Sequence, residues 1–143
     1  MQRIMAQIHQ GLARLLLLGF VIQVYLATEP LFGVPVTFQH HRMLGYTLAV
    51  LVILLFVLAL AGRLDRKWIG LSALLGVLII VQVMLPSLRG RISWIAALHA
   101  VNALAVIRTT ITMARARPLS AGLGTGDELA HPAAAASLSV APR

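Results

Sequence analysis

Six strongly polar residues lie within or at the ends of long apolar runs, and they are the first candidates for chemistry. They are Gln23, His40, His41, Gln82, His99 and Asn102. Polar groups inside a membrane are costly, so their presence there points to a role. An imidazole can bind a metal or a haem iron through a ring nitrogen, whereas the amides favour hydrogen bonds between helices.

The surroundings of two histidines leave room for a large group. At helical spacing, His99 has Ala96 and Ala103 one turn to either side. His41 has Gly45 one turn further along its own run, where the missing side chain suits a flat macrocycle. Small residues equally let a second helix pack closely, so the pattern leaves both explanations open.

Two neutral imidazoles from facing helices can hold a six-coordinate haem iron in a helical bundle. The sequence therefore predicts a b-type haem between His41 and His99, for electron transfer or haem handling. The choice between His40 and His41 as the ligand stays open. The residues predicted to contact the haem or its propionates are His41, His99, Gly45, His40, Arg42 and Ala103, with Arg89 and Arg91 as further partners for the propionates.

The alternative prediction is that these polar residues only hold the bundle together. His40 and His41 would then mark the start of a helix. His99 would hydrogen-bond to Gln82 or Gln23 across the bundle, which is worth roughly 0.6 to 2 kcal/mol. The chain would be a non-enzymatic membrane scaffold or accessory subunit, with small residues such as Ser72 and Gly76 packing against a partner or a second copy.

Other chemistry finds little support in the sequence. No apolar run contains a carboxylate, which argues against a proton relay or an acidic cation site of a transporter. The absence of cysteine excludes disulfides and thiol chemistry. There is no phosphate-binding glycine loop, metalloprotease motif or nucleophile elbow, and zinc needs more ligands than two histidines supply. No set of catalytic residues is predicted.

The elements that carry these residues are predicted to be four membrane-spanning helices. The chain of 143 residues is 59% hydrophobic and 11% charged, against about 25% charged in soluble domains. A span needs about 20 apolar residues, and continuous runs without alternation favour helices over barrel strands. The prediction is an all-α, antiparallel four-helix bundle in the cell membrane, with helices at about 12–31, 40–62, 68–88 and 92–113 within a domain at 1–113.

Loop charges predict the orientation. Cytoplasmic loops carry an excess of Lys and Arg, so the more basic side is assigned to the cytoplasm, with both termini inside. That side holds Arg3, Arg14, Arg63, Arg66, Lys67, Arg108, Arg115 and Arg117, whereas the other holds Arg42, Arg89 and Arg91. The net charge of +8 is therefore explained by orientation in a lipid bilayer rather than by binding to nucleic acid. Residues 114–143, rich in Ala, Gly, Ser and Pro, are predicted to be a disordered cytoplasmic tail.

A weak internal repeat relates the two halves of the predicted bundle. The first run holds Val-Ile-Gln-Val around Gln23, and the third holds Ile-Val-Gln-Val around Gln82. Gln23 precedes His41 by 18 residues, and Gln82 precedes His99 by 17. Two hairpins of this kind would stack in parallel about an axis along the membrane normal.

Short motifs resemble one four-helix half of haem A synthase. They are His41-Arg42-Met43-Leu44-Gly45-Tyr46, Gln82-Val83-Met84-Leu85 and Ala97-Leu98-His99, and the likeness covers about 12–113. The resemblance implies that His41 and His99 are haem ligands. Phe38 stands where the catalytic half of those enzymes has an acid, the paired loop cysteines are missing and there is one bundle instead of two. Haem A synthesis is therefore not implied.

The chain also resembles a family of small, uncharacterised bacterial four-helix membrane proteins. The shared layout is His-Arg-x-x-Gly-Tyr at the start of the second helix and Leu-His-x-x-Asn-Ala on the fourth. This resemblance supports the fold and implies no activity.

Overall fold

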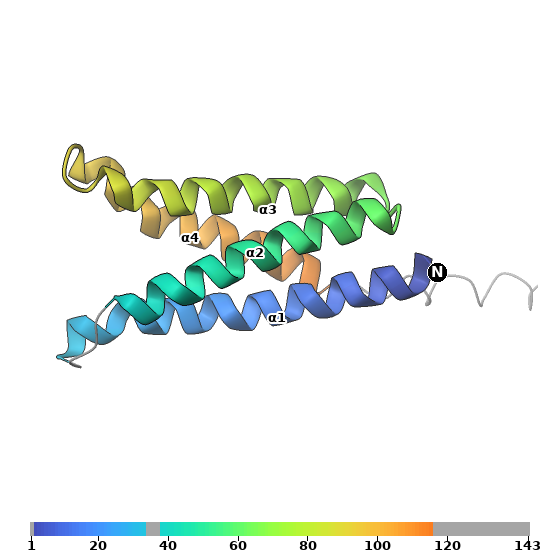
Figure 1. The fold of residues 1–143 in the computed structure, drawn as a ribbon, viewed down its shortest axis with the longest axis horizontal. Helices are drawn as coiled ribbons and strands as arrows, with labels where there is room; N and C mark the ends of the chain where they lie inside the picture. Colours follow the sequence, from blue (N-terminus) through green and yellow to red (C-terminus); the bar gives the residue numbers. More distant parts are fainter. Residues whose placement is uncertain (1, 34–37, 116–143) are drawn as a thin grey trace, which may run out of the picture.

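The computed structural model describes residues 2–33 and 38–115, which form four long helices in an antiparallel bundle (Figure 1). The long helices are α1 (Gln2–Thr28), α2 (Gln39–Ala61), α3 (Arg66–Met84) and α4 (Ser93–Ala114). Short 3-10 helices follow α1 and α3, namely η1 (Glu29–Phe32) and η2 (Leu85–Leu88). The predicted all-α bundle is confirmed.

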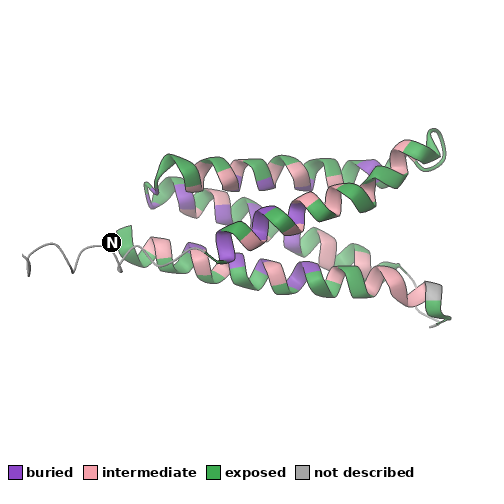
Figure 2. Cartoon of the chain, turned by 180° about the vertical axis from the view of Figure 1, so that it is seen from behind, coloured by how far each residue is buried: buried purple, intermediate pink, exposed green. Residues whose placement is uncertain are grey.

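All four helices are long and apolar enough to cross a membrane. Their outward surfaces carry large apolar side chains, such as Val50, Val77 and Leu104, which are between 57% and 68% exposed. Figure 2 shows this exposed surface around a narrower buried strip. Exposing so much apolar surface to water is unfavourable, whereas the hydrocarbon core of a membrane accommodates it. The chain is therefore a four-span membrane protein.

Each helix packs against two neighbours. α1 and α3 both contact α2 and α4, so α1 lies diagonally opposite α3, and α2 lies diagonally opposite α4. The chain forms a first hairpin from α1 and α2 and a second hairpin from α3 and α4 (Figure 1). The diagonal relation matters because a side chain on α2 can face one on α4 only across the middle of the bundle.

The two ends of the bundle differ in charge and packing. We call the end with the start of α1, the α2–α3 turn and the end of α4 the basic end, and the opposite end the histidine end. The buried residues of the four long helices fall within 9–20 of α1, 48–59 of α2, 72–79 of α3 and 106–114 of α4. These stretches lie in the middle and toward the basic end. Toward the histidine end the two hairpins diverge (Figure 1).

The first helix begins at Gln2 rather than near residue 12. The added turns are amphipathic, because His9 and Ala13 point into the bundle while Arg3 and Gln7 stay exposed. A search for continuous apolar residues misses such a segment, since only one of its faces is buried. The end of α4 is tied to this helix, because Arg14 Nε donates to the backbone oxygen of Ala114 at 3.3 Å.

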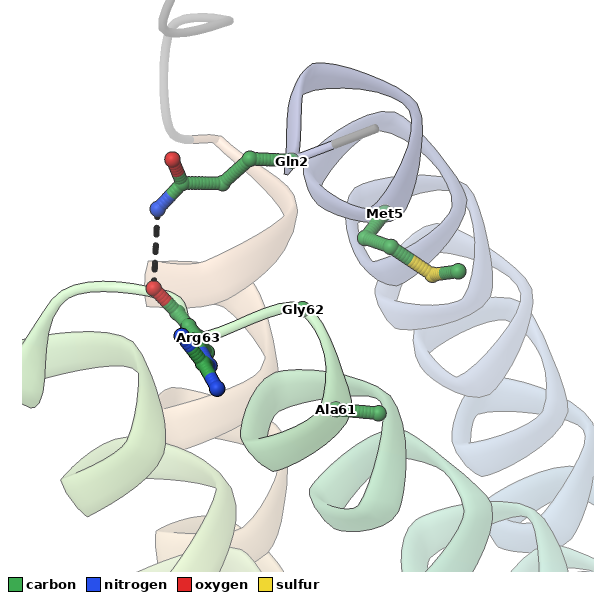
Figure 3. Close-up of a pocket in the computed structure, with 5 residues that line it drawn as sticks. All are labelled: Gln2, Met5, Ala61, Gly62 and Arg63. Atoms are coloured by element: carbon green, nitrogen blue, oxygen red, sulfur yellow. Dashed lines mark hydrogen bonds between the residues drawn. The ribbon is translucent and has the colours of Figure 1, made fainter.

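The α2–α3 turn closes the basic end with a Schellman motif. Leu64 N donates to Ala59 O and Arg63 N donates to Leu60 O, both at 3.0 Å. Arg63 takes the left-handed conformation, with φ of 48°, where glycine is the usual residue. Gln2 Nε2 donates to Arg63 O at 2.9 Å and so fastens the start of α1 to this turn. A small pocket here is lined by Gln2, Met5, Ala61, Gly62 and Arg63 (Figure 3).

The predicted bounds of the other three helices agree with the structure to within a few residues. The connection between the first two predicted helices includes 34–37, and these residues lie outside the described part of the chain. The predicted tail at 114–143 does so as well, except for Ala114, which ends α4, and Arg115, which caps it.

Candidate functional site

His41 and His99 face each other across the diagonal between α2 and α4. Their ring centroids are 6.2 Å apart, and the ring planes are inclined at 61°. Both side chains are half-buried at the histidine end. His40 is exposed and points away from the bundle, so His41 is the member of the pair that faces the interior.

Each imidazole is held by a backbone carbonyl of the neighbouring helix in its own hairpin. His41 Nδ1 lies 3.1 Å from Gln23 O, and His99 Nδ1 lies 2.9 Å from Gln82 O. A carbonyl oxygen can only accept, so each Nδ1 carries the proton and donates it. In the neutral rings, Nε2 is then the atom with a free lone pair. The same contact in both hairpins agrees with the internal repeat in the sequence.

The amide of Gln82 occupies the free nitrogen of His99. Gln82 Nε2 lies 3.2 Å from His99 Nε2, and this amide is the donor because Nε2 of the ring has only its lone pair to offer. Asn102 Nδ2 donates to Gln82 Oε1 at 2.6 Å and to Leu78 O at 2.8 Å. These bonds join α3 to α4, as predicted for interhelical hydrogen bonding by the amides.

The amide of Gln23 is arranged differently in the first hairpin. Gln23 Nε2 donates to the backbone oxygen of His41 at 2.6 Å. A Cβ atom at Gly45 would lie 2.8 Å from this nitrogen, so the space that the glycine leaves holds the Gln23 amide. Gln23 Oε1 is buried and has no hydrogen-bond partner among the described residues. The room predicted beside His41 therefore exists, but a side chain of the protein fills it in this structure.

The remaining residues predicted for the site differ in their exposure. Ala103 is half-buried on α4. Arg42 is exposed at the start of α2, and Arg89 and Arg91 are exposed in the connection between α3 and α4. All three arginines belong to the histidine end, so this end carries positive charge beside the two imidazoles.

A buried histidine, His9, was missed by the sequence analysis. His9 on α1 is only 3% exposed, and its Nε2 lies 2.9 Å from Ser72 Oγ on α3. The Ser72 hydroxyl also approaches Met113 Sδ at 3.9 Å. The spacing of His9, Ala13 and Leu16 is the signal that could have located the inward face of this helix. Ser72 lies fully inside the bundle, so it does not pack against a partner as the scaffold prediction required.

Among residues 2–33 and 38–115, no group of three or more His, Cys, Asp or Glu side chains could hold a metal ion.

Comparison with known proteins gives one match. Residues 23–90 match a family of unknown function, DUF6220. The matched stretch begins at the glutamine that holds His41 and ends just after η2, so it includes Gln23, His41, Gly45 and Gln82 and stops before α4. No curated protein and no solved structure matches the chain.

Proposed function

We propose that the chain binds a b-type haem between His41 and His99 and serves in electron transfer or haem handling. The observation that carries the proposal is the facing pair of imidazoles, with each Nδ1 bonded to a backbone carbonyl. Metal-bound histidines usually donate their second ring nitrogen in this way, which fixes the tautomer and aims the other nitrogen at the metal.

The separation of the rings supports an axial pair. A metal–imidazole bond is about 2.0 Å, and a ring nitrogen lies about 1.1 Å from its centroid, so two imidazoles on opposite sides of one metal have centroids about 6 Å apart. The distance of 6.2 Å between His41 and His99 agrees with this value. A bis-histidine haem would supply one-electron transfer at this place.

Two amides occupy the space beside the imidazoles and would have to move for a haem to bind. The hairpins diverge at the histidine end, where the four long helices have no buried residues, and Arg42, Arg89 and Arg91 are exposed and could pair with propionates. The Gln82 amide lies on His99 Nε2, and the Gln23 amide fills the space at Gly45. Both are flexible side chains, so both could turn aside without a change in the helices.

The proposal includes a location. With the basic end in the cytoplasm and both termini inside, the histidine pair lies near the outer surface of the cell membrane. A redox partner or a second copy of the chain would then reach the site from that side.

The second candidate is a scaffold or accessory subunit without a cofactor. It is favoured by the hydrogen bonds of Gln82, Asn102 and His99, which close the second hairpin on itself without any ligand. In that case the histidine end would only fix the register of the helices, and a partner subunit would give the protein its role.

An absorption spectrum of the purified full-length protein, before and after addition of haemin, separates the two candidates. The haem proposal predicts a Soret band with the features of two axial imidazoles, lost in His99→Ala and in His41→Ala. His40→Ala is the matched control, because His40 is exposed and adjacent in sequence, and it should retain the spectrum. A colourless wild-type protein that takes up no haemin would reject the haem proposal and leave the scaffold or accessory subunit as the remaining candidate.

A further inference from the structure

The two histidines of the pair have unequal surroundings, although their hairpins repeat the same carbonyl contact. His99 Nε2 receives a hydrogen bond from Gln82, whereas the equivalent Gln23 donates to the backbone of His41 and leaves that ring nitrogen alone. His41 Nε2 has no hydrogen-bond partner among the described residues. The two hairpins therefore differ in the partner of the glutamine amide, whereas the contact between Nδ1 and the backbone carbonyl is the same in both.

Two sequence differences between the hairpins account for this asymmetry. One turn along from the histidine, the first hairpin has Gly45 and the second has Ala103. The glycine leaves the space in which the Gln23 amide reaches the backbone of α2. Three residues after the histidine, the first hairpin has Leu44, which cannot hydrogen-bond, and the second has Asn102.

Asn102 fixes which end of the Gln82 amide meets the imidazole. Its Nδ2 can only donate, so it selects Gln82 Oε1 at 2.6 Å and directs Gln82 Nε2 toward His99. Asn102 is itself held by Leu78 O at 2.8 Å. The chain of contacts therefore runs from the backbone of α3 through Asn102 and Gln82 to the ring of His99.

We propose that Gln82, oriented by Asn102, controls the availability of His99 Nε2. The lone pair of His41 Nε2 is then free to bind a ligand, whereas that of His99 Nε2 is blocked by the Gln82 amide. This inference rests on the proposed function and deepens it. A ligand that needs the lone pairs of both imidazoles would bind His41 first and would have to displace Gln82 to reach His99. Gln82 and Asn102 are positioning residues, because they act on the ligand through His99.

The inference can be tested without haem, using diethyl pyrocarbonate, which acylates an imidazole nitrogen that has a free lone pair. Full-length protein is treated in detergent, and the modification rate at each histidine is measured by peptide mass spectrometry. Exposed His40 is the internal reference. Gln82→Leu and Asn102→Leu should each raise the rate at His99 about fivefold relative to His40, as expected from the loss of one hydrogen bond.

Gln23→Leu is the matched control, because it removes the equivalent amide from the first hairpin. It should leave the rate at His41 unchanged, because the Gln23 side chain donates to the backbone oxygen of His41 and the Nδ1 contact uses the Gln23 backbone, which the substitution retains. Asn102→Leu keeps the Gln82 amide but removes the hydrogen bond that orients it. The same increase at His99 in Asn102→Leu and Gln82→Leu would therefore show that the orientation of the amide matters. An unchanged rate at His99 in both, or an equal response of the two hairpins, would overturn the inference.

A haemin titration of the same variants separates this inference from the proposed function. Gln82→Leu and Asn102→Leu should bind haemin with a Kd about fivefold lower than that of wild type, because no amide competes for His99. Haemin uptake without this change would count against the inference alone. If the acylation response is unequal but the protein takes up no haemin, the control of His99 Nε2 by Gln82 is supported and the proposed haem binding is rejected.

Discussion

Two pairs of side chains cross the bundle diagonally, and they differ in burial and in hydrogen bonding. At the basic end, His9 on α1 meets Ser72 on α3, and both are almost fully buried. At the histidine end, His41 and His99 are half-buried, and the nearby Gln23 Oε1 has no hydrogen-bond partner within the described part of the chain. A closed polar contact stabilises a bundle, whereas half-exposed lone pairs can receive a ligand. The first pair is therefore a structural contact and the second a candidate site.

The role of the first pair can be measured through Ser72→Ala. The change leaves the buried His9 without its partner, which we expect to lower the free energy of unfolding by about 1 kcal/mol. Denaturation in mixed micelles, followed by circular dichroism, gives the value.

Ser87→Ala serves as its control, because Ser87 is exposed and its hydroxyl donates to the nearby Met84 O. The control should stay within about 0.5 kcal/mol of wild type. If Ser72→Ala matched it, His9 and Ser72 would not form a stabilising contact, and their facing positions would need another explanation.

The first hairpin depends on a close approach between its two helices. Gly19 is buried on α1, and a Cβ atom there would overlap the side chain of Leu48 on α2. Leu48 is only 3% exposed, so it has little space into which to move. The position and burial of Gly19 thus set the distance between α1 and α2, and with it the reach from Gln23 to His41.

Gly19→Ala is expected to destabilise the protein by about 1 to 3 kcal/mol, because it overpacks the α1–α2 contact. Gly76→Ala is the matched control on α3, since nothing lies within 4 Å of a Cβ atom at Gly76. There alanine should be neutral or stabilising by up to about 1 kcal/mol, as in any open helical position. Equal effects of the two substitutions in the same unfolding assay would show that helix propensity, and not packing, governs both sites.

Much of the fold and part of the site could be predicted from the sequence, for reasons visible at particular residues. Long apolar runs predict spans because lipid leaves the backbone no other way to satisfy its hydrogen bonds, and four such runs are four helices here. Helical spacing placed small residues beside His41 and His99 but left open which of His40 and His41 faces the interior, and the exposure of His40 in the structure selects His41. The first turns of α1 were missed because they bury only one face, around His9.

The arrangement of the amides could not be predicted in the same way. Gly45 marks a space in the sequence, but no pattern in the residues says that Gln23 fills it. The choice between Gln82 and Gln23 as the hydrogen-bond partner of His99 likewise depends on side-chain geometry, and in the structure Gln82 is the residue near enough to bond to the ring. Such contacts depend on the rotation of neighbouring helices by a fraction of a turn, which periodicity does not specify.

Across the whole molecule, positive charge and packing are both unevenly distributed. Most of the described cations lie at the basic end, where the helices are also most tightly packed, whereas Arg42, Arg89 and Arg91 lie at the histidine end. The excess of cations predicts that the basic end faces the cytoplasm. The diverging half of the bundle, with its two imidazoles, would then face outward.

The orientation can be tested directly because the chain contains no cysteine, so any single cysteine is a unique label site. Phe32→Cys places a thiol at the histidine end, where Phe32 is 82% exposed, and Asp65→Cys places one in the exposed α2–α3 turn without removing a cation. With a membrane-impermeant maleimide, Phe32→Cys should react in intact cells and Asp65→Cys only after permeabilisation. The reverse pattern would put the histidine pair near the inner surface, where a ligand would have to arrive from the cytoplasm.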